Sequence, residues 1–186
     1  MQTITDKKGY LSREDVEKII GCTTSLRDRL ILQILYRCGR RVSEALLIEY
    51  DKVLWKDKAI IFRILKRRQN EEHIIPVDGD TLQLIRKYVD EEGIRKGRLF
   101  MLSRQQVFNI IRDAGKCAGI TYVGKKRLHP HHLRHSFAVH FIKKFGQARL
   151  RDLQEILCHK NISTTAEYLQ FDLKDVREGY DEMWEE

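Results

Sequence analysis

Four short segments of this sequence carry side chains that can bind a phosphate group or move a proton beside one. They are Gly39-Arg-Arg41-Val-Ser-Glu44, Lys66, His131-His-Leu-Arg134, and the pair His159 and Tyr168. Guanidinium groups hold phosphate oxygens through paired, charge-assisted hydrogen bonds, histidine and lysine exchange protons, and a tyrosine hydroxyl can serve as a nucleophile. Each segment alone is weak evidence, because a surface arginine or lysine is usually solvated and a helical tyrosine usually packs against its neighbours.

The elements that would position the first segment follow from hydrophobic spacing and helix-capping signals. A helix is predicted to start at Ser12 and to end at Gly21, and a second helix carries apolar side chains on one face over residues 26–35. A third, short helix is expected to open at Ser43. The first two predicted helices therefore lead directly into Arg41.

The middle of the chain changes from helical to strand-like spacing. Residues 59–65 and 73–77 are rich in β-branched side chains, which predicts a hairpin, with Lys66 near its turn, in a sheet of about three strands. Helical spacing then returns, and helices are predicted around residues 82–89, 103–118, 130–141, 150–157 and 164–168. The last of these holds Tyr168.

Composition bounds the class of protein. The 186 residues are 42% hydrophobic, which is enough for a buried core in a single domain. Basic side chains outnumber acidic ones by 35 to 27, and the net charge of +8 suits a polyanionic partner without identifying it. The four cysteines form no C-x-x-C pair, and the sequence has neither a signal peptide nor an apolar run of membrane-spanning length. We therefore expect a soluble, cytoplasmic protein with reduced cysteines.

Taken in chain order, the four segments resemble the tyrosine recombinases of the phage integrase family, whose motif runs arginine, lysine, His-x-x-Arg, histidine or tryptophan, and tyrosine. Cys38-Gly-Arg-Arg-Val-Ser-Glu44 is similar to the family's T-G-x-R-x-S-E, which places the first arginine on Arg41 rather than Arg40. Residues 128–140 resemble the second box, and residues 157–168 resemble L-G-H-x-x-x-x-T-T-x-x-Y. The resemblance implies a mainly α fold with a small antiparallel β-sheet, the catalytic-domain fold of these recombinases.

The resemblance also implies a site that exchanges DNA phosphodiester bonds without a cofactor, a metal or ATP. Arg41 and Arg134 would hold the non-bridging phosphate oxygens, and His159 would donate to the same oxygens. Tyr168 would take the phosphate as a 3′-phosphotyrosyl ester, and His131 would exchange the tyrosine proton.

Two further residues would assist. Lys66 would protonate the leaving 5′-oxygen as a general acid. Arg67 and Arg68 follow it directly, so the alignment could slip by a residue or two. Glu44, three residues after Arg41, would orient a guanidinium or a base.

One departure from the family motif concerns the turn before His159. Cys158 stands where the family has glycine, and it would strain the turn only if this position requires an unusual backbone angle. Three rival interpretations stay open: a zinc site built from the histidines of residues 129–135 with Cys158 and His159, a DNA-binding protein without catalysis, and a relaxing type IB topoisomerase.

Double-stranded DNA is the expected partner, with self-association on the DNA as a tetramer and a location at the nucleoid of a prokaryotic, viral or mobile-element host. The candidate DNA contacts are basic residues: Arg67, Arg68, Lys125, Lys126, Arg127, Lys143 and Lys144. Residues 170–186 are predicted to be a docking tail, which packs on its own chain or on a neighbouring protomer. Because the first helix begins by Ser12, we expect residues 1–186 to be one catalytic domain without an N-terminal core-binding domain.

Overall fold

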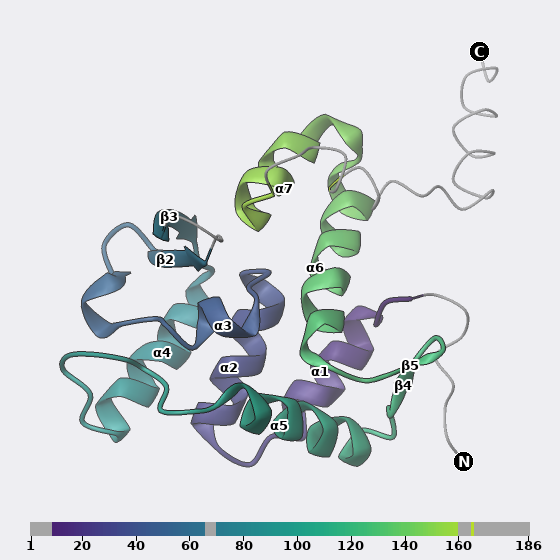
Figure 1. Cartoon of the computed structure of the whole chain (residues 1–186), viewed down its shortest axis with the longest axis horizontal. Coiled ribbons are helices and arrows are strands. Elements are labelled where there is room, and N and C mark those ends of the chain that lie inside the picture. The colour runs from purple at the N-terminus through teal and green to yellow at the C-terminus, as the bar shows by residue number, and fades with distance from the viewer. Residues whose placement is uncertain (1–8, 66–69, 160–164, 166–186) are drawn as a thin grey trace.

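Helices make up most of the architecture in the computed structural model, which describes residues 9–65, 70–159 and 165 (Figure 1). The helices are α1 Arg13–Gly21, α2 Leu26–Arg37, α3 Val42–Ala45, α4 Gly79–Glu91, α5 Arg104–Cys117, α6 Pro130–Phe145 and α7 Leu150–Leu157, with 3-10 turns η1 Tyr50–Lys52 and η2 Gln147–Arg149. The strands are β1 Val53–Leu54, β2 Ala59–Leu65, β3 Asn70–Pro76, β4 Tyr122–Val123 and β5 Lys126–Arg127. The predicted fold class, mainly α with a small antiparallel sheet, is confirmed. None of the described helices has the length and apolar character needed to cross a bilayer.

Capping side chains start α1 and α5 where the sequence predicts them. At α1, the hydroxyl of Ser12 accepts from the backbone N–H of Asp15 at 3.0 Å, and the Asp15 carboxylate accepts from the N–H of Ser12 at 3.2 Å. At α5, Ser103 and Gln106 form the same reciprocal pair. These bonds satisfy N–H groups that a helix leaves without partners at its start.

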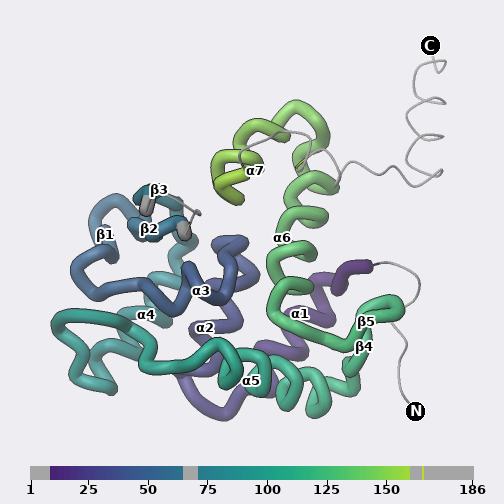
Figure 2. Tube along the Cα trace, in the orientation of Figure 1, coloured from purple at the N-terminus to yellow at the C-terminus, as the bar shows by residue number. Residues whose placement is uncertain are grey.

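The main core forms around α2, and a smaller cluster joins α6 to α7. Helices α4 and α6 both pack against α2, in which Leu30, Ile31, Leu32, Ile34 and Leu35 are fully buried. The second cluster consists of Ala138, Ile142, Leu153 and Leu157. Helix α6 is therefore fixed along its length, and α7 folds back from its far end toward α3 (Figure 2).

The predicted hairpin is present in a three-stranded antiparallel sheet with the order β1-β2-β3. Alternate side chains of β2, among them Phe62, are buried in the core, as expected for a strand with one covered face. The turn between β2 and β3, which contains Lys66, Arg67 and Arg68, lies outside the described residues.

A second hairpin, β4–β5, was not predicted from the sequence. Each strand has only two residues, too few for an alternating pattern to be recognised. Gly124 in the turn has a φ of +57°, and the hairpin exposes Lys125, Lys126 and Arg127 to solvent.

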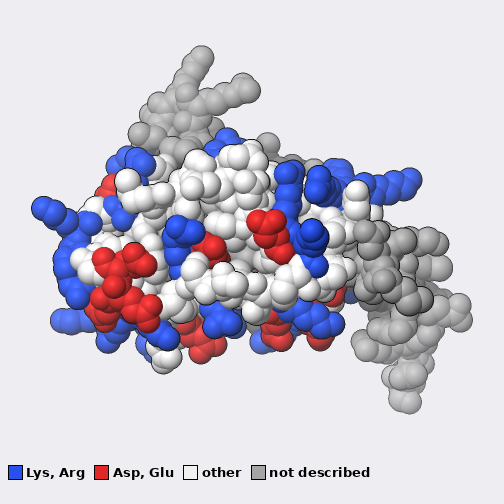
Figure 3. Space-filling view, turned by 90° about the horizontal axis from the view of Figure 1, so that it is seen from below, with Lys and Arg blue, Asp and Glu red and all other residues white. Residues whose placement is uncertain are grey.

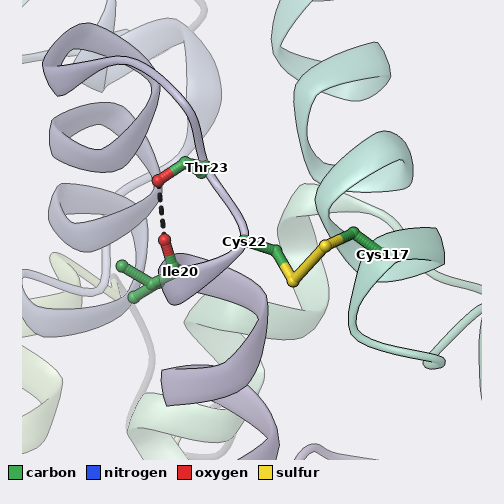
Figure 4. The surroundings of a disulfide bond; sticks show 4 residues. All are labelled: Ile20, Cys22, Thr23 and Cys117. Carbon is green, nitrogen blue, oxygen red and sulfur yellow. Dashed lines mark hydrogen bonds between the residues drawn. A yellow bond between two sulfur atoms is a disulfide. The ribbon is translucent and has the colours of Figure 1, made fainter.

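A disulfide between Cys22 and Cys117 joins the end of α1 to the end of α5 (Figure 4). Their Cα atoms are 6.0 Å apart, although the two residues are separated by 95 positions in the sequence. The expectation of four reduced cysteines is therefore wrong for this pair, while Cys38 and Cys158 are free thiols. Sequence spacing could not reveal the pair, because only the packing of α1 against α5 brings the two residues together.

Candidate active site

A buried carboxylate, that of Glu44, lies among three guanidinium groups. Its Oε1 accepts from Nη1 of Arg41 at 2.8 Å, and its Oε2 accepts from the backbone N–H of Arg41 at 3.1 Å. Oε2 also lies 4.0 Å from Nη1 of Arg40 and 3.9 Å from Nη1 of Arg134. One negative charge thus faces three positive charges, and the cluster keeps a net positive charge that suits an anion.

The three arginines differ in their access to solvent. The side chain of Arg41, the N-cap of α3, is 48% exposed, whereas the side chains of Arg40 and Arg134 are 0% and 1% exposed. Helix α3 begins at Val42, one residue before the predicted Ser43, and this leaves Arg41 at its open end. Of these three side chains, that of Arg41 is therefore the one that an anion in solvent can reach.

Arg134, on α6, connects segments that are far apart in the chain. Its Nη1 donates to the carbonyl of Gly39 at 2.7 Å, and its Nη2 donates to the carbonyl of Leu157 at 2.9 Å and to Nε2 of His159 at 2.9 Å. Gly39 has a φ of +59°, and a Cβ there would lie 2.7 Å from Cδ1 of Phe137. Glycine at this position lets the backbone approach α6 and present its carbonyl to Arg134.

The ring of His159 is neutral in this arrangement. Because a guanidinium only donates, Nε2 must accept, so Nδ1 carries the proton and donates to the hydroxyl of Thr165 at 3.0 Å. Desolvation and then the charges of Arg134 and Arg41 lower the pKa of His159 to about 4. Nε2 therefore has no proton to offer a phosphate oxygen until the ring is protonated or changes tautomer.

The turn before His159 adopts the left-handed conformation. Cys158 has φ 53° and ψ 43°, and it ends α7. The backbone N–H of Cys158 donates to the carbonyl of Glu155 at 3.0 Å, and that of His159 donates to the carbonyl of Gln154 at 3.1 Å. Glycine adopts these angles without strain and cysteine does not, so the departure from the family motif falls where it matters.

His131 lies on α6 three residues before Arg134, as its spacing predicts. The residue is exposed, yet partial desolvation by the surrounding protein and the charge of Arg134 lower its pKa to about 4. A neutral imidazole at neutral pH can accept a proton. The tyrosine that is predicted to supply this proton, Tyr168, lies outside the described residues.

Sequence reasoning gave Arg40 no role, and it considered His132 only as a candidate zinc ligand, although both side chains are buried. Nδ1 of His132 accepts from the backbone N–H of His129 at 3.2 Å, and desolvation, together with neighbouring histidines, lowers its pKa to about 3. Its position, third in a helix that opens with Pro130, is one where a capping side chain is expected. The sequence holds no comparable signal for Arg40, because an arginine beside another arginine is usually at the surface.

The candidate DNA contacts do not form one patch in the described part of the molecule. Lys125, Lys126 and Arg127 lie before the start of α6, while Lys143 and Lys144 lie at its end. The 16 residues of α6 span about 24 Å. On the face shown in Figure 3, basic residues are interspersed with acidic ones, so its described part is no continuous basic surface. The predicted contacts Arg67 and Arg68, and the predicted acid Lys66, lie outside the described residues.

The histidines at the start of α6, together with Cys158 and His159, are the candidate zinc ligands of the rival interpretation. Within residues 9–65, 70–159 and 165, no three His, Cys, Asp or Glu side chains lie close enough together to hold a metal ion. The described geometry therefore gives the zinc interpretation no support.

Comparison with known proteins identifies the family. The model of the phage integrase family matches residues 9–174. The chain belongs to this family. The tyrosine recombinase XerA of Pyrococcus horikoshii is 31% identical over 178 residues, which cover 91% of this chain and 59% of XerA. The tyrosine recombinase XerD of Staphylococcus saprophyticus is 34% identical over 194 residues, which cover 97% of this chain and 61% of XerD. The chain thus spans about three fifths of the length of these two curated relatives.

Solved structures of the phage integrase family share the fold. A crystal structure of XerA recombinase matches with a TM-score of 0.78 and 25% identity, covering 95% of this chain and 65% of that one. The catalytic domain of bacteriophage HP1 integrase matches with a TM-score of 0.68 and 24% identity, covering 94% of this chain and 95% of that one. XerH recombinase in a post-cleavage complex with its difH substrate matches with a TM-score of 0.77 and 22% identity, covering 95% of this chain and 53% of the XerH chain. The predicted catalytic-domain fold is confirmed.

Proposed function

We propose that this chain is the catalytic part of a site-specific DNA recombinase or integrase that cuts and rejoins DNA strands through a covalent 3′-phosphotyrosyl intermediate. The observation that carries the proposal is the convergence of Arg41, Glu44, Arg134 and His159 from three distant segments. The names of the relatives XerA and XerD support it, as does the DNA in the XerH complex. We further propose that the same residues use no metal, cofactor or ATP, because guanidinium groups supply the positive charge.

In the proposed reaction, the oxygen of Tyr168 forms a bond to phosphorus while the bond from phosphorus to the 5′-oxygen breaks. The tyrosine proton passes to His131, and Lys66 gives a proton to the departing 5′-oxygen. One ester bond to phosphorus breaks and one forms, so the number of phosphate ester bonds stays the same. Attack by the 5′-hydroxyl of another strand reverses these steps and rejoins DNA in a new combination.

The two arginines would act at different stages of phosphate binding. Arg41 is exposed and would bind a non-bridging oxygen first. The buried Arg134 donates to protein acceptors, and it would turn Nη2 from His159 to the phosphate as charge develops there. His159, protonated or with its proton on Nε2, would then donate to the same phosphate.

Double-stranded DNA is the proposed partner, and we propose that several copies of the chain assemble on it. Residues 170–186, which lie outside the described residues, would dock on the same chain or on a neighbouring one. Deletion of residues 174–186 should leave a folded protein whose assembly on DNA or cleavage is altered. Assembly and cleavage that are both unchanged would remove the docking role.

The test of the proposed function is the replacement Tyr168→Phe. Nicked suicide substrates that carry candidate recombination sites trap the covalent adduct, which is detected as a shift on denaturing gels. The adduct should form with the wild type and vanish in Tyr168→Phe, while DNA binding survives. Tyr122→Phe on β4 is the matched control, because Tyr122 is 47% exposed and should be dispensable. An adduct that persists in Tyr168→Phe would show that another residue is the nucleophile.

A second experiment tests Lys66 as the general acid. A substrate with a 5′-thiolate leaving group needs no proton, so it should restore much of the rate that Lys66→Ala loses. The same substrate should not rescue Arg67→Ala or Arg68→Ala. Rescue of either arginine variant in place of Lys66→Ala would transfer the role to that residue.

A further inference from the structure

We infer that Arg40 is a positioning residue that holds the end of α7 and, through the Cys158 turn, sets the placement of His159. This inference rests on the proposed function, because it concerns the same site. Arg40 occupies the x of the T-G-x-R-x-S-E motif, so the family motif assigns it no role.

Arg40 is fully enclosed by protein, and its donors are directed to specific acceptors. Nε donates to the carbonyl of Cys38 at 2.8 Å, and Nη2 donates to the carbonyl of Ile156. Nη1 lies 3.6 Å from Sγ of Cys158, and the guanidinium carbon lies 5.1 Å from the centre of the Phe62 ring. Because its side chain is 0% exposed, Arg40 cannot contact DNA directly.

Two arginines bind consecutive carbonyls at the end of α7. Arg40 binds the carbonyl of Ile156, and Arg134 binds the carbonyl of Leu157 at 2.9 Å. The last carbonyls of a helix lack partners within the helix and carry partial negative charge, so cations stabilise them. Together the two guanidinium groups fix the position where α7 ends and the turn to His159 begins.

The turn itself needs such support. Cys158 takes left-handed angles, which disfavour any side chain with a Cβ. The contact from Nη1 of Arg40 to Sγ of Cys158 links the strained residue to the buried cation. Arg40 and Cys158 are therefore coupled, and a change in one should alter the effect of a change in the other.

Arg40 also acts on His159 through its charge. It is one of three arginines, after Arg134 and Arg41, whose positive charge favours the neutral ring. A buried cation is costly unless it is paired, and an apolar side chain of similar size would fill the same space without this cost. A positive charge at this location is explained by the groups that it contacts, which are the carbonyl of Ile156 at the end of α7 and the carboxylate of Glu44.

The experiment compares Arg40→Met, Arg40→Lys and the control Arg95→Met. Arg95 is a matched control because it binds the carbonyls of Val89 and Ile94 near the end of α4, 3.0 and 2.9 Å away, and contacts no residue of the site. Arg40→Met should reduce single-turnover cleavage by about 10- to 100-fold, since a small displacement of a reacting group has effects of this size. DNA affinity should stay unchanged, because Arg40 is buried. Arg95→Met should leave both quantities as in the wild type.

The pKa of His159, measured by NMR in the protein without DNA, provides a readout that a merely structural residue would not move. It should rise in Arg40→Met and stay near the wild-type value in Arg40→Lys and Arg95→Met. If Arg40→Met fails to fold, Arg40→Lys still tests the inference. A lysine cannot bridge three acceptors, so this variant should cleave DNA more slowly than the wild type. Wild-type cleavage and an unchanged His159 pKa in the folded Arg40 variants would overturn the inference.

A second arm tests the coupling between Arg40 and the turn. In a Cys158→Gly background the turn is relaxed, so Arg40→Met should cause a smaller fold-loss of cleavage than it causes in the wild type. Equal losses in both backgrounds would show that Arg40 does not act through the turn. If the wild type forms no adduct with any substrate, the proposed function fails, whereas the NMR comparison still decides whether Arg40 controls His159.

Discussion

Nη2 of Arg134 lies 2.9 Å from Nε2 of His159, and this contact fixes the histidine as a hydrogen-bond acceptor in the protein without DNA. The proton on Nδ1 is held by Thr165 at 3.0 Å. The two side chains that are predicted to stabilise the same phosphate are therefore bonded to each other before it arrives.

We predict that His159 has its proton on Nδ1 in the free protein and gains a proton on Nε2 when DNA binds. Arg134 would then donate to the phosphate, and Nε2 would donate to the same group. Nitrogen-15 chemical shifts of the imidazole report the tautomer directly. Thr165→Val, which removes the acceptor of Nδ1–H, should shift the free protein toward the other tautomer. A proton on Nε2 in the free wild type would contradict the prediction.

Arg41→Lys and Arg134→Lys should each lower the cleavage rate by about 10²- to 10³-fold, the usual effect of losing one well-placed donor. Lysine retains the charge but cannot reproduce the guanidinium fork. Arg41→Lys should also weaken binding of the DNA, because Arg41 is the exposed member of the pair. Near wild-type cleavage by Arg134→Lys, measured in single turnover, would count against the assignment.

Glu44→Gln should destabilise the protein by about 3–5 kcal/mol, because it leaves the buried guanidinium groups without their carboxylate. Glu44 is 2% exposed and lies near Arg40 and Arg134 as well as Arg41. Urea unfolding measures the change. Glu91→Gln is the control, since Glu91 is 56% exposed and its ion pair with Lys87 should contribute little. Similar unfolding curves for the two variants would show that Glu44 is not an essential counter-ion.

Much of the fold and part of the site were predictable because they depend on local patterns. The capping residues Ser12 and Ser103 predict the starts of α1 and α5, and the run of β-branched residues at 59–65 predicts β2. Position in a motif also predicted that Arg134 and His159 belong together. Tertiary contacts between residues outside the motif were not predictable.

Arg40 and Cys22 illustrate the second kind. Arg40 is buried between the end of α7 and Phe62 of β2, and its sequence neighbours give no sign of this. Cys22 finds Cys117 only because α1 packs against α5. Helix spacing says which face of an element is buried, but not which distant element covers it.

Lowering the pH from 6.5 toward 3 should progressively destabilise the protein through its buried histidine His132. Desolvation lowers the pKa of His132 from 6.5 to about 3, so the unfolded chain binds this proton and the folded protein does not. Stability is then fully present above pH 6.5 and falls as the pH drops, by about 2 kcal/mol at pH 5 for His132. His131 is exposed and should contribute less. Urea unfolding at pH 7, 6 and 5 gives the slope, which should be shallower in His132→Gln. A wild-type stability that does not change between pH 7 and 5 would refute this prediction.

The disulfide should lower the number of titratable thiols, and a reductant should lower the stability of the protein. Protein purified without reductant and then denatured should show two titratable thiols, those of Cys38 and Cys158, and four after reduction. Before denaturation only Cys158 should react, because burial raises the pKa of Cys38 to about 12. Since the bond closes a loop of 95 residues, its loss should cost about 4–5 kcal/mol if the unfolded chain behaves as a flexible polymer. Cys22→Ser should reproduce the effect of the reductant, and adding reductant to Cys22→Ser should change its stability no further. Four thiols in the unreduced, denatured protein would show that the bond does not form in solution.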